Sequence, residues 1–374
     1  MRIGIIDCRI QDQTTKVKSM KANYTWKTAC IIRETSDATS IIFDTGKDEF
    51  SFLPGQFVNL SLKIKNKIVT RSYSLCSAAD EDEKPTVTVK RVKGGVMSNY
   101  IIDHAEEIEE WQIEGPHGSF YPDENVMQAE NIVLIAGGSG ITPVFSILKY
   151  YLKHTSADVI LINANRTKGD VIFKNSLAYM EQLFKHRFII WNCFSGAADE
   201  NDHPAENIIR ERLSKLLLKK LLKTLLGDKL NQAAYFMCGP SGLLQMSGET
   251  LVSLNVQTGL VYKEYFKLPE EPAKKLKLPR KTLEVLLHHY DQTLLVQVKP
   301  HNTILEAALQ DRIGVNYSCK AGTCGMCVAK LTSGEVHMAN NFALPVEQIK
   351  QGYILLCQSH PLDNNVTVEI NAFQ

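Results

Sequence analysis

The sequence has almost no excess of charge of either sign. It contains 42 Lys and Arg residues against 41 Asp and Glu residues, so its formal net charge is +1. A balanced chain produces no long-range field that would attract nucleic acid or an anionic membrane. We therefore expect neither of them as a partner.

Long apolar runs are also lacking. No stretch approaches the roughly 18 apolar residues that a transmembrane helix needs, and the N-terminal MRIGIIDCRI is too short and too polar for a secretory signal. Nine cysteines in 374 residues do not make a disulfide framework. Five of them are scattered and are interpreted as free thiols of a cytoplasmic protein: Cys8, Cys30, Cys76, Cys193 and Cys238.

What is present divides into three blocks and predicts a multidomain protein. Residues 20–125 hold short strand-like runs such as ATSIIFDT and QFVNLSLKI, which indicate an antiparallel β-barrel. Residues 126–267 alternate buried strands with helical stretches, which predicts an α/β domain with a parallel sheet. Residues 268–281 carry three prolines and many charges, as a linker does, and residues 282–374 form an α+β block.

One Leu- and Lys-rich segment, RERLSKLLLKKLLKTLLGDKL at 210–230, allows two interpretations. A basic amphipathic helix can lie on a membrane or bind a partner. The favoured alternative is a crossover helix that packs its leucines on the sheet and ends at Gly227.

The most specific signal is the stretch YSCKAGTCGMC. Cys319, Cys324 and Cys327 have the spacing C-x4-C-x2-C, and Cys357 follows after 29 intervening residues. This spacing is typical of a plant-type [2Fe–2S] cluster, which needs four thiolates. Structural zinc sites usually use two C-x2-C pairs, and only one is present here, so iron–sulfur is favoured over zinc.

Four further motifs occur in a fixed order on the β-rich block: FLPGQFV at 52–58, RSYS at 71–74, KRVKGGVMSNYI at 90–101 and GPHGSF at 115–120. Each is weak alone. Together they resemble the ferredoxin–NADP reductase superfamily, and the cysteine block resembles a plant-type ferredoxin with its β-grasp fold. The resemblance implies a flavin barrel, a nicotinamide domain and a ferredoxin domain in that order.

For the flavin, taken as FAD, the resemblance assigns roles to the second and third motifs. Arg71 would pair with the pyrophosphate, Tyr73 would contact the flavin, and Ser74 would place a hydroxyl near its reactive nitrogen. The start of a helix in GGVMS would bind phosphate through its free N–H groups. Its residues are Gly95, Val96, Met97 and Ser98.

For the nicotinamide cofactor, the resemblance points to the ends of three strands. LIAGGSGITP is a Gly-rich turn with Pro143 where the Rossmann fingerprint has its third glycine. Its matching residues are Gly138, Ser139, Gly140 and Thr142. Further on, Cys238, Gly239 and Pro240 would lie beside the nicotinamide ring, and Glu264 and Phe266 would lie near the flavin. We predict Ser74, Cys238 and Glu264 as the catalytic set.

The strand ending in NANRT predicts which nicotinamide is used. An Asp or Glu at such a strand end usually marks a cofactor without a 2′-phosphate, and here Arg166 stands in its place. This favours NADPH over NADH, although an exposed loop arginine remains an alternative.

The whole chain except residues 1–20 resembles the reductase subunits of bacterial phenylacetyl-CoA epoxidases, most closely in NRTKGDVIFKNSL and NNFALPVEQIKQGYILLCQSHPL. The resemblance implies that electrons pass from NADPH through FAD and the [2Fe–2S] cluster to a di-iron oxygenase. Residues 282–374 hold five Lys or Arg against eight Asp or Glu, which suits a basic docking partner. Reductases for a desaturase, another oxygenase or a hybrid-cluster protein, and a non-enzymatic redox sensor, are the alternatives.

Overall fold

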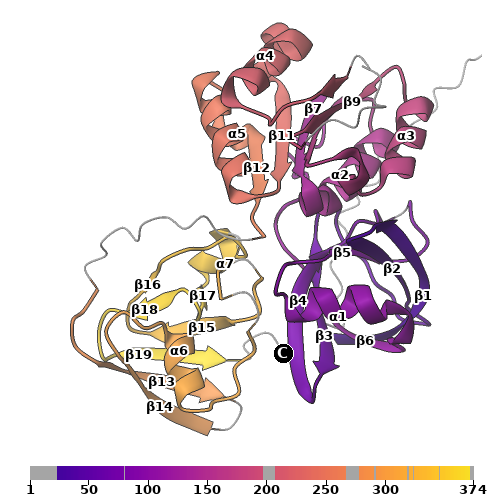
Figure 1. The fold of residues 1–374 in the computed structure, drawn as a ribbon. Helices are drawn as coiled ribbons and strands as arrows, with labels where there is room; N and C mark the ends of the chain where they lie inside the picture. The colour runs from indigo at the N-terminus through magenta and orange to yellow at the C-terminus, as the bar shows by residue number, and fades with distance from the viewer. Residues whose placement is uncertain are drawn as a thin grey trace, which may run out of the picture.

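The computed structural model describes residues 23–79, 81–196, 207–266, 278–289, 292–317, 320–322, 324–344 and 346–370. They form three main sheets, one in each predicted block (Figure 1). No helix within these ranges is long and apolar enough to cross a membrane. Of the predicted linker at 268–281, residues 268–277 lie outside the described residues.

The first sheet is antiparallel and closes on itself. Its strand order is β4-β3-β6-β1-β2-β5, and a bridge between Leu75 and Val87 joins its two ends. Strand β3 turns its apolar alternate residues, such as Leu60, inward onto buried Trp26 and Trp111, as period-two alternation requires. Its elements are β1 (Asn23–Thr35), β2 (Ala38–Asp44), β3 (Phe57–Ile64), β4 (Lys67–Ser74), β5 (Thr86–Lys90), α1 (Val96–His104), η1 (Ala105–Glu107) and β6 (Glu110–His117).

The second sheet is parallel, in the order β10-β9-β8-β7-β11-β12. Its elements are β7 (Asn131–Gly137), η2 (Gly138–Gly140), α2 (Ile141–His154), β8 (Asp158–Asn165), η3 (Lys168–Asp170), α3 (Lys174–Leu183), β9 (Phe188–Phe194), β10 (Ile208–Ile209), α4 (Lys215–Leu226), η4 (Gly227–Asn231), β11 (Ala233–Cys238), α5 (Ser241–Ser253), η5 (Thr258–Leu260) and β12 (Val261–Glu264). Helices α2 and α3 cover one face, and α4 and α5 cover the other (Figure 1).

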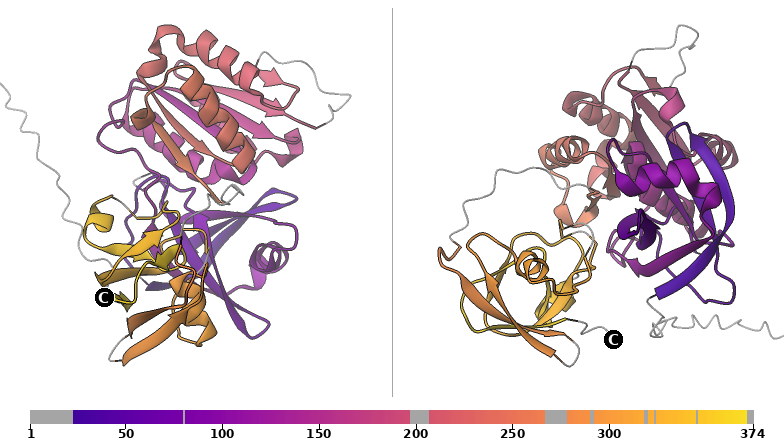
Figure 2. Two further views of the ribbon diagram at one scale, coloured as in Figure 1. Left: turned by 90° about the vertical axis from the view of Figure 1, so that its left-hand side faces the viewer. Right: turned by 60° about the horizontal axis from the view of Figure 1, so that its bottom comes forward.

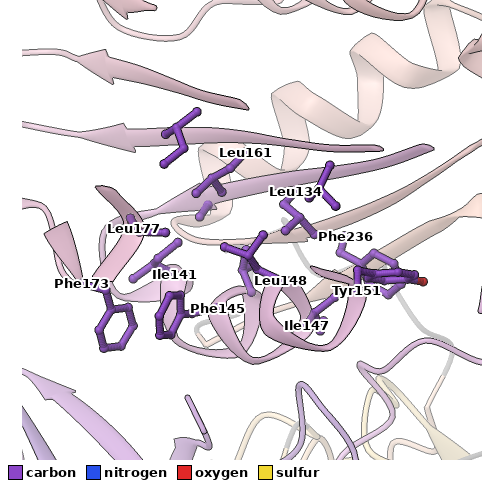
Figure 3. Close-up of a cluster of buried hydrophobic side chains, with 14 of the residues drawn as sticks. Leu134, Ile141, Phe145, Ile147, Leu148, Tyr151, Leu161, Phe173, Leu177 and Phe236 are labelled. Carbon is purple, nitrogen blue, oxygen red and sulfur yellow. The ribbon is translucent and has the colours of Figure 1, made fainter. Parts of the chain in front are cut away.

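Both faces of this sheet carry a core, because its strands are apolar without alternation. In β7, Leu134 faces the α2 side and Val133 faces the α4 side. Figure 3 shows Leu148 of α2 pointing toward the sheet and Phe145 lying beside Phe173. These two rings are stacked at 4.4 Å between centroids.

The Leu- and Lys-rich segment forms α4, which packs on the sheet. Leu218 and Leu222 are fully buried in the core of that face. The Ser214 hydroxyl accepts a hydrogen bond from the amide of Leu217 at 3.3 Å and caps the helix, and Gly227 ends it with a positive φ of 52°. The crossover interpretation is confirmed.

Helix α2 also fixes the barrel against the parallel sheet. The buried Ser146 hydroxyl donates to the carbonyl of Ser77 at 2.6 Å and accepts from the amide of Gly55 at 3.3 Å. Lys149 forms an ion pair with Asp82 of the barrel. Buried hydrogen bonds of this kind are costly to leave unmade, so the two blocks meet in one preferred arrangement.

The third sheet is mixed, in the order β14-β13-β19-β15-β17, with a small β16-β18 ribbon beside it. Helix α6 packs on it and begins with a capping box in which Thr303 and Glu306 satisfy each other's backbone amides. The elements are β13 (Leu283–His289), β14 (Gln292–Val298), α6 (Ile304–Gln310), β15 (Val328–Ser333), β16 (Val336–Met338), α7 (Val346–Lys350), β17 (Tyr353–Leu355), β18 (Ser359–Pro361) and β19 (Val366–Ile370).

Candidate functional site

The RSYS motif is the last half of strand β4. Strand pairing with β3 continues to its end, at Ser74 opposite Phe57. Arg71 is exposed and donates to the carbonyl of Thr70 at 2.7 Å, whereas Tyr73 is half-buried and Ser74 is buried. Burial raises the pKa of the Tyr73 phenol, so this side chain stays neutral.

Three predicted catalytic residues meet where the barrel adjoins the parallel sheet. Cys238 and Glu264, the last residues of β11 and β12, are register partners. The nearby Ser74 hydroxyl of the barrel lowers the pKa of the Glu264 carboxyl. The larger effect is burial, which raises that pKa to about 8. Burial and the charge of Glu264 also raise the pKa of the Cys238 thiol.

One oxygen of Glu264 has no hydrogen-bond partner in the described part of the chain. The residue as a whole is partly exposed, but its Oε2 atom is buried. A buried acceptor without a partner is costly and marks a position where a further polar group fits. The unpaired Glu264 oxygen, at the strand end next to that of Cys238, fits a ligand with polar ring atoms such as a flavin or a nicotinamide.

The GGVMS stretch begins α1, as predicted. Gly95 is the N-cap, and the first helical residue, Val96, is 56% exposed, so this helix end is open. The Ser98 hydroxyl accepts a hydrogen bond from the amide of Val92 at 3.2 Å. A Cβ on Gly95 would come within 2.6 Å of this hydroxyl, so glycine fits this position best. An open helix N-terminus with unpaired N–H groups suits a phosphate.

The Gly-rich turn follows β7 and includes η2. A Cβ on Gly140 would come within 2.2 Å of the carbonyl oxygen of Cys238, so only glycine allows this close approach of backbones. Gly138 has a positive φ of 53°, and the Thr142 hydroxyl donates to the carbonyl of Ser139 at 3.0 Å. The turn lies between β7 and β11, where the strand order reverses, which is the usual ligand crevice of such sheets.

A cavity of about 500 Å³ opens beside this turn. It is lined by three cationic side chains from three separate segments: Lys90 from the end of β5, Arg166 after β8, and Arg212 before α4. Gly137, Gly138, Ser195 and Pro240 are also in its wall. This volume is in the range of cofactor pockets, and its cations suit an anionic ligand.

Sequence reasoning predicted Arg166 but missed Lys90 and Arg212. Lys90 stands at the head of KRVKGG, a motif whose predicted role is in flavin binding alone, and only the packing of barrel on sheet brings it to the Gly-rich turn. Burial lowers its pKa, and the nearby Asp170 acts in the opposite direction. Arg212 carries no motif that marks it.

Arg166 has an acidic neighbour that the strand-end argument did not consider. Its guanidinium pairs with Asp170 at 2.9 Å while its side chain stays 70% exposed. Asp170 also accepts from the Thr167 hydroxyl at 2.9 Å, and these partners lower its pKa despite the opposing effect of partial burial. Arg166 is therefore oriented at the cavity, but part of its charge is balanced.

The other predicted nicotinamide residues lie around the same crevice. Gly239 approaches the turn closely, since a Cβ there would lie 3.0 Å from the amide nitrogen of Gly137. Pro240 lines the cavity. Phe266, predicted near the flavin, is 47% exposed two residues beyond the end of β12.

Three of the four predicted cluster cysteines lie in described residues, and Cys319 lies outside them. Cys324, Cys327 and Cys357 are all buried. The amide of Cys357 donates to the Cys327 sulfur at 3.4 Å, and the Gln358 side-chain amide lies 3.8 Å from the Cys357 sulfur. Donors directed at sulfur suit thiolate ligands.

Two glycines of the cysteine loop have backbone conformations that let the loop turn tightly around a bound cluster. Gly322 and Gly325 have φ values of 74° and 72°, a conformation that favours glycine. Within the described ranges no three His, Cys, Asp or Glu side chains are grouped to hold a single ion. A [2Fe–2S] cluster does not require three ligands around one ion, because its four cysteines bind two irons.

The scattered cysteines agree with the prediction wherever they are described. Cys30, Cys76, Cys193 and Cys238 form no disulfide, and Cys8 lies outside the described residues.

Family models match all three blocks. The oxidoreductase FAD-binding domain matches residues 31–121, the oxidoreductase NAD-binding domain matches 134–249, and the 2Fe-2S iron-sulfur cluster binding domain matches 287–362. The predicted three-part fold and cofactor classes are thereby confirmed. The chain is a modular oxidoreductase that combines FAD-, NAD- and 2Fe–2S-binding domains.

Curated relatives match this chain over nearly its whole length and over nearly the whole of their own. The chain is 30% identical to the ferredoxin reductase component of 3-ketosteroid-9-alpha-monooxygenase from Rhodococcus rhodochrous, over 91% of this chain and 95% of that protein. It is 27% identical to one of the subunits of 1,2-phenylacetyl-CoA epoxidase from Escherichia coli, with the same coverage. The chain belongs to the ferredoxin reductase-type family of oxidoreductases.

Solved structures show the same fold at low identity. Phthalate dioxygenase reductase is 21% identical, with a TM-score of 0.55 over 93% of this chain and 98% of that chain. A type IV self-sufficient cytochrome P450 monooxygenase has a TM-score of 0.68 and 21% identity, over 92% of this chain and 41% of that chain.

Proposed function

We propose that this protein oxidises NADPH and passes the electrons through FAD and a [2Fe–2S] cluster to an oxygenase. The observation that carries the proposal is the cation-lined cavity beside the Gly-rich turn, whose wall includes Pro240, two residues after Cys238. A redox sensor would need no such cavity, which is the reason to prefer an enzyme.

The protein's part in this reaction is to bind and orient, because the cofactors supply the redox chemistry. Bound FAD accepts two electrons as a hydride and releases them singly, and the cluster carries one. Arg71 and the open end of α1 would hold the FAD phosphates, and Tyr73 would contact the flavin. Ser74 and Glu264 would hold the reacting rings in place with Cys238.

The nicotinamide cofactor would enter through the cavity beside the Gly-rich turn. Gly138, Ser139, Gly140 and Thr142 would meet its phosphates at the switch point. Lys90 and Arg212 join Arg166 as candidate partners for its negative charges. The backbone of Gly239 and Pro240 would border the nicotinamide end.

The cluster would be held by Cys319, Cys324, Cys327 and Cys357. The hydrogen bond from the Cys357 amide to the Cys327 sulfur supports the assignment of both residues as ligands of one group.

The acceptor is proposed to be the oxygenase of a phenylacetyl-CoA epoxidase. Support comes from the 27% identity to a protein of the Escherichia coli enzyme and from the 340–362 stretch that resembles such reductases. A ketosteroid monooxygenase is the second candidate, because its reductase component is 30% identical. A third relative, the reductase subunit of glycine betaine monooxygenase from Pseudomonas aeruginosa, is 27% identical. Reconstitution with each oxygenase separates them: the correct one consumes NADPH only when its substrate is added.

The purified wild-type protein tests the proposed chemistry. We expect flavin and iron–sulfur absorption bands, iron without zinc, and NADPH-dependent reduction of both ferricyanide and cytochrome c. A protein that contained zinc but no iron, or that bound no flavin, would contradict the proposal.

Arg166→Ala tests cofactor choice. A hydrogen bond to a charged group contributes about 1.5–3 kcal/mol, so KM for NADPH should rise by about tenfold or more, with little change for NADH. Lys220→Ala is the matched control, because it also removes a positive charge, but from an exposed position on α4 outside the cavity. Equal effects on both cofactors would show that Arg166 does not bind the 2′-phosphate. The same assay on Arg212→Ala would then test the other arginine of the cavity.

A further inference from the structure

Two aromatic rings join the parallel-sheet block to the ferredoxin-type block. The ring centroids of Tyr265 and Phe342 lie 5.4 Å apart with an interplanar angle of 53°. Aromatic rings attract each other over this range. Figures 1 and 2 show the ferredoxin-type block beside the end of β12, which Tyr265 follows.

On one side, the contact is tied to the proposed flavin site. Tyr265 is the residue directly after Glu264, and its ring packs against the core formed under α4 and α5. The position of the Tyr265 ring is therefore fixed by the same strand end that holds the Glu264 carboxyl beside Ser74.

On the other side, the contact is tied to the cysteine loop. The amide of Phe342 donates to the carbonyl of Gly322 at 3.0 Å, and Gly322 stands between two proposed cluster ligands in the sequence. A Cβ on Gly322 would come within 2.9 Å of the carbonyl oxygen of Asn340, so the loop and the 340–342 segment are in close backbone contact.

Gln358 braces the same assembly next to Cys357. Its side-chain amide donates to the carbonyl of Lys320 at 3.0 Å and its oxygen accepts from the Asn340 amide at 3.0 Å. The loop, the Cys357 segment and the Phe342 segment are thus hydrogen-bonded together. We therefore expect that a displacement of Phe342 would also displace the cysteine loop.

We propose that the Tyr265–Phe342 contact docks the cysteine loop beside the flavin side of the reductase core and thereby positions the cluster to receive electrons. The inference rests on the proposed function. The step that it serves moves one electron from reduced flavin to oxidised cluster and needs no other reactant. In this proposal Tyr265 and Phe342 are positioning residues, because they act through the placement of the cysteine loop.

Phe342→Ala and Tyr265→Leu test the contact in the full-length protein with its cofactors. The Phe342 ring is 41% exposed, so its truncation removes the contact without opening a buried core. Loss of an aromatic pair lowers the docked population by up to about tenfold. We expect cytochrome c reduction to fall by that factor, while ferricyanide reduction and the EPR signal of the reduced cluster stay unchanged. The double variant should fall no further than either single one.

Leu295→Ala is the matched control, because Leu295 is a 55% exposed apolar residue on β14 of the same block. Hydrogen exchange gives a second readout that requires no turnover: the amides of 261–266 should lose protection in Phe342→Ala and keep it in Leu295→Ala. Unchanged protection of these amides in Phe342→Ala would show that the contact does not hold the two blocks together. Lost protection with an unchanged or faster cytochrome c rate would overturn its role in electron transfer. Wild-type protein inactive with ferricyanide would instead contradict the proposed function itself.

Discussion

Replacement of Cys357 by serine is expected to abolish the cluster and leave the flavin in place. Even outer partners of metal ligands contribute about 10–100-fold to metal affinity. Loss of a ligand should therefore lower cytochrome c reduction by about a hundredfold or more. Ferricyanide reduction by NADPH should persist, because its electrons can leave from the flavin in a different block. Optical bands and the EPR signal of the reduced protein measure the cluster directly.

The buried position of Cys357 requires a control for folding. Cys193→Ser also replaces a buried cysteine, but one in the core of the parallel sheet, far along the chain from the loop. Cys30→Ser replaces an exposed one. Both should retain the EPR signal. An unchanged signal in Cys357→Ser would show that the fourth ligand is another residue.

The three sheets could be predicted from sequence because each has its own local pattern. The strand pattern of the barrel, the continuous apolar strands such as NIVLIAGG and the cysteine spacing are all readable over short distances. The convergence of Ser74, Cys238 and Glu264 depended instead on a family resemblance. Nothing in their spacing shows that the ends of these three strands, so far apart in the chain, lie close together.

Features built from contacts between blocks could not be predicted. Lys90 reaches the cation-lined cavity only because α2 fixes the barrel on the parallel sheet through Ser146. Arg212 comes from a separate segment of the same block. The Asp170 partner of Arg166 is local, four residues away, and could have been found by considering ion pairs at that spacing. The contact of Tyr265 with Phe342 joins segments that are far apart in the chain, which no periodicity encodes.

Glu264→Gln is expected to change the pH dependence of the protein. Burial raises the pKa of the Glu264 carboxyl to about 8, whereas its ordinary value is 4.5. Between these values the folded state holds a proton that the unfolded state has released, so stability falls as pH rises through this window. The slope due to one group is at most about 1.4 kcal/mol for each pH unit. Below pH 4.5 and above pH 8, this group contributes no slope.

The difference between wild type and Glu264→Gln isolates this carboxyl, because the other titrating groups cancel. Its neighbour Cys238 has a raised pKa and stays protonated through the window. Denaturant unfolding at about pH 5, 6.5 and 8 should show wild type losing stability relative to the variant. Equal pH dependence in both proteins would show that Glu264 is ionised in the folded state throughout.

The same titration should appear in catalysis if Glu264 lies beside the nicotinamide ring. Loss of a hydride leaves positive charge on that ring, which an ionised carboxylate stabilises. The rate of NADPH-dependent ferricyanide reduction should therefore rise as pH passes about 8, and Glu264→Gln should remain flat and about a hundredfold slower above it. Ser74→Ala, which removes the hydroxyl that lowers this pKa, should move the rise to higher pH. A rate profile with the same midpoint in all three proteins would place the titrating group elsewhere.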